Sequence, residues 1–360
     1  MGYGRWREED FRNYSAGRGR TVRMDGTLDT SGHTAQTMYT ERGLHPALNP
    51  RGVMRECCEN EEHPNTMPVI LALDVTGSMG SAAMEVAAKL NEVMTELLGT
   101  DMDVEFMIMG IGDLAYDRAP IQISQFESDI RIAEQLDKIY FEGGGGGNMF
   151  ESYTAAWYMA LHHTRLDCWK RGQKGLIITM GDEPMNPYLP AKPLTQAVGD
   201  PLQGDVETGK LLKEIRGKYD LYHIFVRHGS NFYETRAAKS WRKYLDKKHF
   251  QCCDVKGIGQ MLTGIITAEA EKRQAADPAK GLIRFADTEE AKGTTAEAKG
   301  TTAEAKETAP ASEDTAAAGI GWDIKPEKAE ETAAWTDGKN RRDRKGRGGL
   351  RGLFAGGINW

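Results

Sequence analysis

Few cysteines are present in this sequence, and their arrangement argues against a protein stabilised by disulfides. Five occur in 360 residues, and four of them form two adjacent pairs, Cys57 with Cys58 and Cys252 with Cys253. Adjacent cysteines are poor material for a disulfide framework, so we expect reduced thiols. A zinc site of Cys57, Cys58 and His63 is an alternative, although the two-residue spacing that is usual for zinc-binding cysteines is absent.

Long hydrophobic runs are missing as well. The first ten residues, MGYGRWREED, contain no apolar stretch of the kind found in a secretory signal. No run of about eighteen apolar residues occurs anywhere, so we expect no transmembrane helix. Both absences predict a cytoplasmic protein without a membrane partner.

An overall excess of basic residues is also lacking. The formal net charge is −7 at pH 7, which argues against a protein devoted to nucleic acid. Both ends of the chain are locally basic, and contact with nucleic acid is expected only through them.

The apolar residues are concentrated in the middle of the chain, which predicts one core between residues 66 and 272. Residues 1–65 are rich in Gly, Arg, Asn and Thr, and their composition is typical of a basic, partly extended arm. Residues 273–360 are dominated by Ala, Glu, Lys and Thr, and the sequence AKGTTAE occurs twice in tandem. Because threonine and glycine stand where a coiled coil needs leucine, we expect a low-complexity, disordered tail that ends in a basic motif.

Strand and helix patterns alternate within the central segment. Apolar runs of strand length occur at about 69–73, 103–111, 176–180 and 221–226, and a shorter one ends near 253. Helical spacing of apolar residues is found at about 81–98, 207–217, 233–245 and 256–271, and Ser128 with Asp129 can cap a further short helix. This alternation predicts an α/β fold with a doubly wound, mostly parallel sheet.

The first of these strands leads directly into a polar loop. An apolar run is followed by Asp74, Thr76 and Ser78, and such a run is typical of a parallel strand covered on both faces. Ligands of open parallel sheets bind at the carboxyl ends of the strands. One carboxylate and two hydroxyls suit a hard cation such as Mg²⁺. The alternative is a buried aspartate that caps the next helix, with Ser78 or Ser81 as a turn former.

These three residues resemble the first motif, Asp-x-Ser/Thr-x-Ser, of the metal-ion-dependent adhesion site of von Willebrand factor A (VWA) domains. The resemblance extends over about residues 66–272 and is strongest to the hemicentin and alpha-kinase branch, with loops that read GGGDxPE and GDxPxH. The corresponding segments here are GGGNMFE, at 145–151, and GDEPMN, at 181–186. The match implies one metal site whose ligands are Asp74, Thr76, Ser78, Asn148 and Asp182.

Asn148 departs from this pattern because it stands where the family has Asp or Thr. An amide oxygen can bind Mg²⁺ or Ca²⁺ but adds no charge, so the resemblance implies a weaker site, with Glu151 or water as a substitute ligand. The second strand ends in Gly112 and Asp113. Asp113 is either a loop cap or a supporting residue of the site.

The resemblance implies a binding module of the bacterial intracellular type, not an enzyme. It would bind Mg²⁺, or Mn²⁺ or Ca²⁺, and engage an acidic residue of a protein partner through the ion. Because bacterial VWA proteins often work beside MoxR-type AAA+ ATPases, the resemblance also implies such a partner.

The alternative is a metal-dependent hydrolase or phosphatase. A phosphatase of the haloacid dehalogenase type needs a second aspartate where this chain has Thr76. A hydrolase would use Glu151 or Glu183 as its base, but no histidine accompanies them in these motifs. His223 lies inside a strand pattern and is expected to be a packed core residue.

The segment from Glu183 to Asp205 contains five prolines and is expected to have no regular structure. Since it follows Asp182, it should form the rim that selects the partner, and its contact residues are predicted to be Met185, Tyr188 and Leu189. The alternative is that these three side chains fold back onto the domain.

Overall fold

The structure is a computed structural model that describes residues 4–98, 102–142, 150–228 and 234–276. The chain divides into two units, Met1–Ala296 and Glu297–Trp360, and all described residues belong to the first. The predicted tail therefore lies outside the described residues from position 277 onward. None of the described helices is long and apolar enough to cross a membrane.

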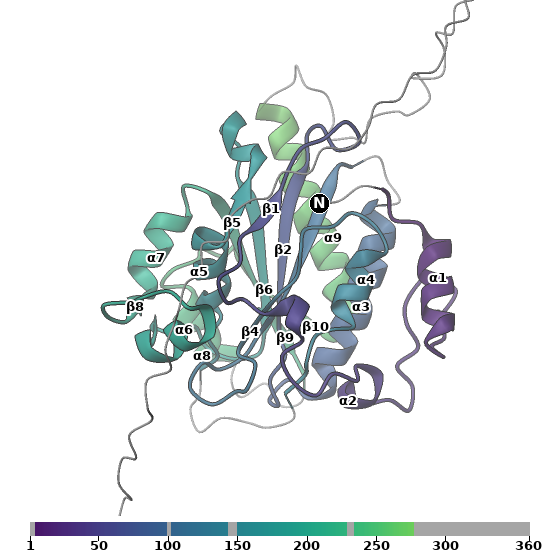
Figure 1. Cartoon of the computed structure of the whole chain (residues 1–360), viewed down its shortest axis with the longest axis horizontal. Coiled ribbons are helices and arrows are strands. Elements are labelled where there is room, and N and C mark those ends of the chain that lie inside the picture. The colour runs from purple at the N-terminus through teal and green to yellow at the C-terminus, as the bar shows by residue number, and fades with distance from the viewer. Residues whose placement is uncertain (1–3, 99–101, 143–149, 229–233, 277–360) are drawn as a thin grey trace, which may run out of the picture. The chain divides into compact units, whose positions relative to one another are not determined.

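A six-stranded sheet forms the centre of the described unit (Figure 1). Its order is β10-β9-β6-β2-β3-β4, and every neighbouring pair is parallel except β3 and β4. The strands are β2 (Met67–Asp74), β3 (Val104–Ile111), β4 (Ile121–Ile123), β6 (Gly175–Gly181), β9 (Tyr219–Arg227) and β10 (Phe250–Asp254). The predicted α/β fold with a doubly wound, mostly parallel sheet is confirmed. The short antiparallel strand β4 was not among the predicted strands.

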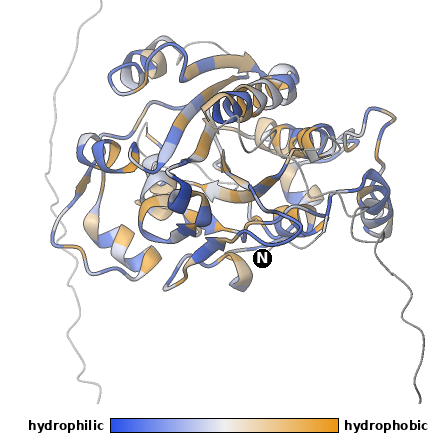
Figure 2. Ribbon diagram, turned by 90° about the horizontal axis from the view of Figure 1, so that it is seen from above, coloured by the Kyte–Doolittle hydropathy of each residue, from blue (hydrophilic) through white to orange (hydrophobic). Residues whose placement is uncertain are grey.

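Helices cover both faces of this sheet because its strands are apolar on both sides. Along β2, Val69 and Leu71 face one apolar cluster while Ile70 and Ala72 face the other, as the alternation of a strand requires. One face is covered by α3 (Ser81–Leu98), α4 (Arg131–Leu136) and α9 (Ile258–Ala276), and the other by α5 (Thr154–His162), α6 (Ala191–Val198), α7 (Thr208–Ile215) and α8 (Glu234–Trp241). Polar and apolar residues alternate along many of these helices (Figure 2).

The direction of winding reverses between β2 and β6. The chain passes from β2 through α3 to β3 on one side, and later returns through α5 to β6 on the other side of β2. The crevice between the carboxyl ends of β2 and β6 is therefore the switch point at which open α/β sheets bind ligands.

The N-terminal segment packs on the same core. It forms α1 (Glu8–Gly17), α2 (Ala35–Met38), the 3₁₀ helix η1 (Pro46–Leu48) and β1 (Arg55–Cys57), which pairs with β5 (Thr164–Leu166). Trp6, Phe11 and Leu48 are buried in the cluster beneath α3 and α9. Helices α1 and α2 were not predicted, because the apolar residues of this segment are irregularly spaced and give no helical period. Only contacts with the rest of the fold bury them. The boundary at residue 66 stays a prediction.

The prediction that the proline-rich segment from Glu183 to Asp205 has no regular secondary structure is wrong. It contains β7 (Tyr188–Leu189), α6 and then β8 (Val206–Glu207), which pairs with β7. Pro193 is tolerated because it lies in the first turn of α6, where a backbone N–H has no partner within the helix. The remaining 3₁₀ helices are η2 (Asp167–Arg171) and η3 (Val255–Gly257).

Candidate metal site

Four of the residues predicted to bind metal meet at the switch point. Asp74 ends β2, and Asp182 follows β6 directly. Thr76 donates to Asp74 Oδ1 from both its N–H and its hydroxyl, at 3.0 and 2.6 Å. Its hydroxyl lies 3.1 Å from Ser78 Oγ, and Ser78 in turn donates to Asp182 Oδ1 at 3.1 Å. The four side chains thus form one continuous chain of oxygen atoms across the crevice.

The row of oxygen atoms runs from the interior of the protein to its surface. Asp74 is fully buried, the side chain of Asp182 is 15% exposed, and Ser78 is exposed. A ligand therefore reaches the site from the side of Ser78, while the carboxylate of Asp74 forms its floor.

Two further residues hold the carboxylates in place. Tyr153, just before α5, donates to Asp74 Oδ2 at 2.6 Å, and its hydroxyl accepts from the N–H of Glu183 at 3.2 Å. His228 Nε2 lies 2.9 Å from Asp182 Oδ2. A Cβ at Gly181 would lie 2.2 Å from the Tyr153 hydroxyl oxygen, so the close approach of this ring depends on glycine at that position.

Sequence reasoning missed both roles. Tyr153 lies among apolar residues in the sequence and belongs to no motif of polar residues, and His228 follows β9 without a motif of its own. Each contact joins elements that are distant in the sequence, so no local pattern could have shown it.

Negative charge accumulates around the site. Burial raises the pKa of Asp74, and the nearby Asp182 raises it further, against the hydrogen bonds from Thr76 and Tyr153. Burial also raises the pKa of Glu183 to about 7, with Asp182 again contributing. The hydrogen bond to Asp182 raises the pKa of His228. A bound cation would relieve this repulsion, since it favours the ionised form of each carboxyl.

Glu151 lies over the end of β2 as well. It forms a parallel bridge with Met185 beyond β6, while the adjacent Ser152 donates its N–H to the carbonyl of Gly112 beyond β3, at 3.2 Å. Glu151 is 8% exposed, and its pKa is raised by burial and by Asp74. The fifth predicted ligand, Asn148, lies outside the described residues.

The donor set fits a hard divalent cation. Mg²⁺ is usually bound by one or two carboxylates, keeps several waters and prefers oxygen ligands. Two carboxylates and two hydroxyls meet that description. No group of three or more His, Cys, Asp or Glu arranged for a metal ion occurs in the described part of the chain, so the candidate site is not of that carboxylate-rich or thiolate type.

Asp113 and His223 have structural roles. Asp113 Oδ1 accepts from the N–H of Ala115 at 2.8 Å, so it caps its loop, as one of the two alternatives stated. His223 is fully buried, and its ring stacks on Trp241 with centroids 3.5 Å apart. Its Nδ1 lies 2.8 Å from the hydroxyl of Thr179. The prediction of a core histidine is confirmed.

The zinc alternative is not supported among the described residues. His63 Nδ1 lies 2.8 Å from Asp103 Oδ1, and Nε2 lies 3.2 Å from the carbonyl of Gly4 and 3.1 Å from Ser128 Oγ. Both ring nitrogens are thus engaged with oxygen atoms, not held towards Cys57 and Cys58.

Two of the three expected contact residues are core residues. Met185 is 3% exposed and Leu189 is fully buried, whereas Tyr188 is 47% exposed. The prediction that all three form a contact surface is wrong for Met185 and Leu189, because both side chains fold back into the apolar cluster between the sheet and α5 to α8. Tyr188 alone remains available to a partner.

Comparison with known proteins gives structural matches only. No protein-family model and no curated protein matches the chain. The pilus adhesin SpaC from Lactobacillus rhamnosus GG matches with a TM-score of 0.40 and 11% identity, over 61% of this chain and 31% of the adhesin. The vWF domain of the type V pili tip protein Mfa5 from Porphyromonas gingivalis matches with 0.37 and 12%, over 56% and 95%.

A third match is the SpRpn10 VWA domain, with a TM-score of 0.31 and 12% identity, over 52% of this chain and 87% of that domain. The match to SpaC covers only about a third of the length of that adhesin. All three TM-scores are below 0.5, so these matches say nothing about the function of the chain.

Proposed function

We propose that this chain is a VWA-type binding module that holds a divalent cation at Asp74, Thr76, Ser78 and Asp182. The observation that carries the proposal is the continuous chain of side-chain oxygens across the switch point, with a fully buried carboxylate at its floor. Asn148 would complete the set. Mg²⁺ suits these ligands best, and Mn²⁺ and Ca²⁺ are the alternatives.

Each residue contributes a distinct part of this binding. Asp74 and Asp182 supply the negative charge, and the hydroxyls of Thr76 and Ser78 supply neutral oxygens. Tyr153 keeps Asp74 oriented. Because two of the four ligands are neutral hydroxyls, the bound ion stays electrophilic enough to accept a further carboxylate. An acidic residue of a protein partner, entering past Ser78, would supply that carboxylate.

Calorimetric titration with MgCl₂ and MnCl₂ tests the metal proposal. Asp74→Asn keeps the shape of the side chain but removes its charge, so binding should be lost. Asp246→Asn is the matched control, because this carboxylate is 68% exposed and pairs with His249 away from the crevice. In the wild type, a metal concentration ten times the dissociation constant should raise the free energy of unfolding by about 1.4 kcal/mol. Equal binding by Asp74→Asn and wild type would show that the motif is only a turn.

The enzyme alternative makes a different prediction. A hydrolase or phosphatase would release product from generic phosphoesters, and that turnover would vanish with Asp74→Asn. A binding module should gain stability from the metal without turnover. Metal-dependent cleavage by the wild type that the variant lacks would replace this proposal with the hydrolase.

The finer part of the proposal concerns the partner. We infer a VWA protein of the bacterial intracellular type that acts in the cytoplasm beside a MoxR-type AAA+ ATPase, because bacterial VWA proteins often work beside such ATPases. Such an ATPase should co-purify with the wild-type chain in the presence of Mg²⁺ and be absent from the Asp74→Asn preparation. Equal recovery with both chains would contradict a metal-bridged contact.

A further inference from the structure

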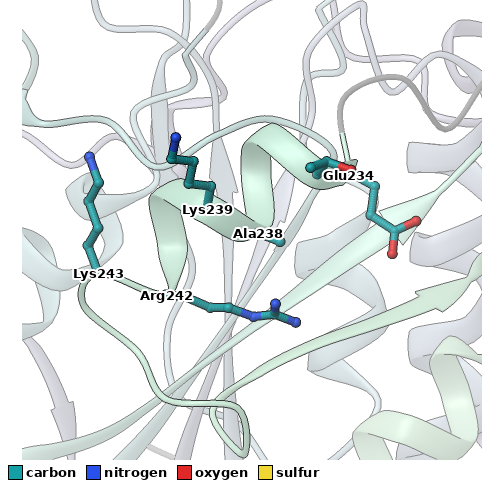
Figure 3. A pocket seen from close by; sticks show the side chains of 6 residues that line it. Glu234, Ala238, Lys239, Arg242 and Lys243 are labelled. Carbon is teal, nitrogen blue, oxygen red and sulfur yellow. The ribbon is translucent and has the colours of Figure 1, made fainter.

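A basic hollow lies on the surface of α8. Its volume is about 740 Å³, and its lining residues are Glu234, Thr235, Ala238, Lys239, Arg242 and Lys243 (Figure 3). Ala237 and Trp241 are buried on the opposite side of the helix. In Figure 3, Lys239 and Lys243 extend in the same direction, and Arg242 lies on the other side of the helix towards Glu234.

The only acid among the lining residues does not neutralise these lysines. Both oxygens of Glu234 are engaged by Arg227, in two hydrogen bonds of 2.8 and 2.6 Å. Lys239 and Lys243 make no ion pair with any residue that the structure describes. Lys239 lies in α8 and Lys243 lies two residues beyond its end. Their side chains extend in the same direction, so the two like charges repel each other. An anionic ligand would turn that unfavourable arrangement into a favourable one.

The buried side of α8 packs against the segment that follows Asp182. The indole N–H of Trp241 donates to the carbonyl of Glu183 at 3.2 Å, and the N–H of Met185 donates to Ser240 Oγ at 3.0 Å. Glu183 and Met185 both belong to that segment, so these two contacts join the helix that carries the basic hollow to the edge of the candidate metal site.

We propose that the basic face of α8, formed by Lys239 and by Lys243 just beyond the end of the helix, binds an acidic segment of the same protein partner that reaches the metal site. The inference rests on the proposed function, and it specifies the partner as a chain rich in Asp and Glu near its metal-bridging carboxylate. Complementary charge on the two surfaces speeds their encounter and fixes their register.

A protein segment fits these surfaces better than a nucleic acid. The acids around Asp74 and Asp182 would repel a phosphate backbone at the adjacent crevice, and the whole chain carries a net charge of −7. The aromatic residue of α8, Trp241, is fully buried, so the helix offers no ring on which a base could stack.

A fluorescein-labelled peptide of ten glutamates is the probe, and its binding to the full chain is followed by fluorescence anisotropy in low salt. The double variant Lys239→Glu/Lys243→Glu should bind the peptide about tenfold more weakly than the wild type. The neutral variant Lys239→Gln/Lys243→Gln should lie between them, about threefold weaker than the wild type. Binding should also weaken as NaCl rises, because the contacts are exposed.

The matched control is Lys192→Glu/Lys256→Glu. It makes the same change in charge on exposed residues of α6 and η3, and Val255 beside Lys256 packs against the cluster on the face of the sheet opposite α8. This control should bind the peptide within about twofold of the wild type. Equal weakening by both double variants would overturn the proposal, since it would show a response to net charge alone.

Asp74→Asn separates this inference from the proposed function. The variant should lose Mg²⁺ binding and yet bind the peptide through α8 within about threefold of the wild type. Unchanged peptide binding by Lys239→Glu/Lys243→Glu would remove α8 as the site and leave the metal proposal standing. Tighter binding of a ten-nucleotide thymidine oligonucleotide than of the peptide would also overturn it, and would assign the face to nucleic acid.

Discussion

Two buried carboxyl groups, at opposite ends of the sheet, differ in how they are satisfied. Asp74 ends β2 and accepts hydrogen bonds from Thr76 and Tyr153. Glu105 lies near the start of β3, is fully buried, and accepts no hydrogen bond from an N or O atom in the described part of the chain. An unpaired buried carboxyl is costly in its charged form, so Glu105 should make the fold sensitive to pH.

Burial raises the pKa of Glu105 to about 7, against the Cys57 thiol and His63, which lower it. The ordinary value is 4.5, so the folded state holds the proton more tightly than the unfolded state between pH 4.5 and 7. The free energy of unfolding should therefore fall as pH rises through this window, by up to about 3 kcal/mol from this group.

Urea denaturation at pH 5 and pH 8 checks this prediction. Glu105→Gln cannot ionise, so it should be more stable than the wild type at pH 8. Its free energy of unfolding should fall less between pH 5 and pH 8 than that of the wild type, by up to about 3 kcal/mol. The fall that remains comes from Asp74 and Glu183, whose pKa values are also raised. Glu207→Gln is the matched control, because this carboxylate is 61% exposed and pairs with Lys210, which does not titrate in this window. It should leave the pH dependence of the wild type unchanged. A Glu105→Gln chain with the pH dependence of the wild type would contradict the assignment.

At the scale of single residues, the motif predicted where Asp74, Thr76, Ser78 and Asp182 lie because each follows a strand whose end the sequence marks. The carboxyl ends of neighbouring parallel strands must share one edge of the sheet. Their hydrogen-bond partners could not be predicted in this way. The ring of Tyr153 reaches Asp74 only because the chain passes closely over Gly181.

Elements with continuous apolar runs were the easiest to predict. β2, β3, β6 and β9 are buried over nearly their whole lengths, and each has a matching run in the sequence. β4 has only three residues, and α2 has four, too few for a period to be visible. The proline-rich segment shows that proline also marks the start of a helix, since Pro190 and Pro193 lie at the start of α6.

β7 provides a test of that segment with adjacent residues. Leu189 is fully buried and Tyr188 is 47% exposed, since successive side chains of a strand point to opposite sides. Leu189→Ala should lower the free energy of unfolding by about 2–5 kcal/mol, whereas Tyr188→Ala should change it by less than about 0.5 kcal/mol. Denaturation curves of the two single variants give both values. If Tyr188→Ala proved as destabilising as Leu189→Ala, the assignment of Leu189 to the core side of β7 and of Tyr188 to the solvent side would be wrong.

At the scale of the whole molecule, the described part of the N-terminal segment belongs to the core. Tyr14 donates to Asp137 Oδ2 at 2.7 Å, and the indole of Trp6 donates to the Thr95 hydroxyl at 3.1 Å. Tyr39 is 1% exposed and stacks on Phe141, with ring centroids 4.7 Å apart. These contacts join the N-terminal segment to α3 and to the chain around α4, so its removal would expose apolar surface on both partners.

Two truncations therefore give opposite predictions. A chain that lacks residues 1–50 should melt at least about 10 °C below the full chain, because several large side chains leave the core, each worth about 1.5–3 kcal/mol, and each kcal/mol corresponds to about 2–4 °C in a domain of this size. A chain that ends at residue 276 should melt within about 2 °C of the full chain, as the composition of the tail predicts. Differential scanning calorimetry of the three chains measures both shifts. If the chain without residues 1–50 had the same melting temperature as the full chain, the buried side chains of Trp6, Phe11 and Tyr39 would contribute no net stability to the fold.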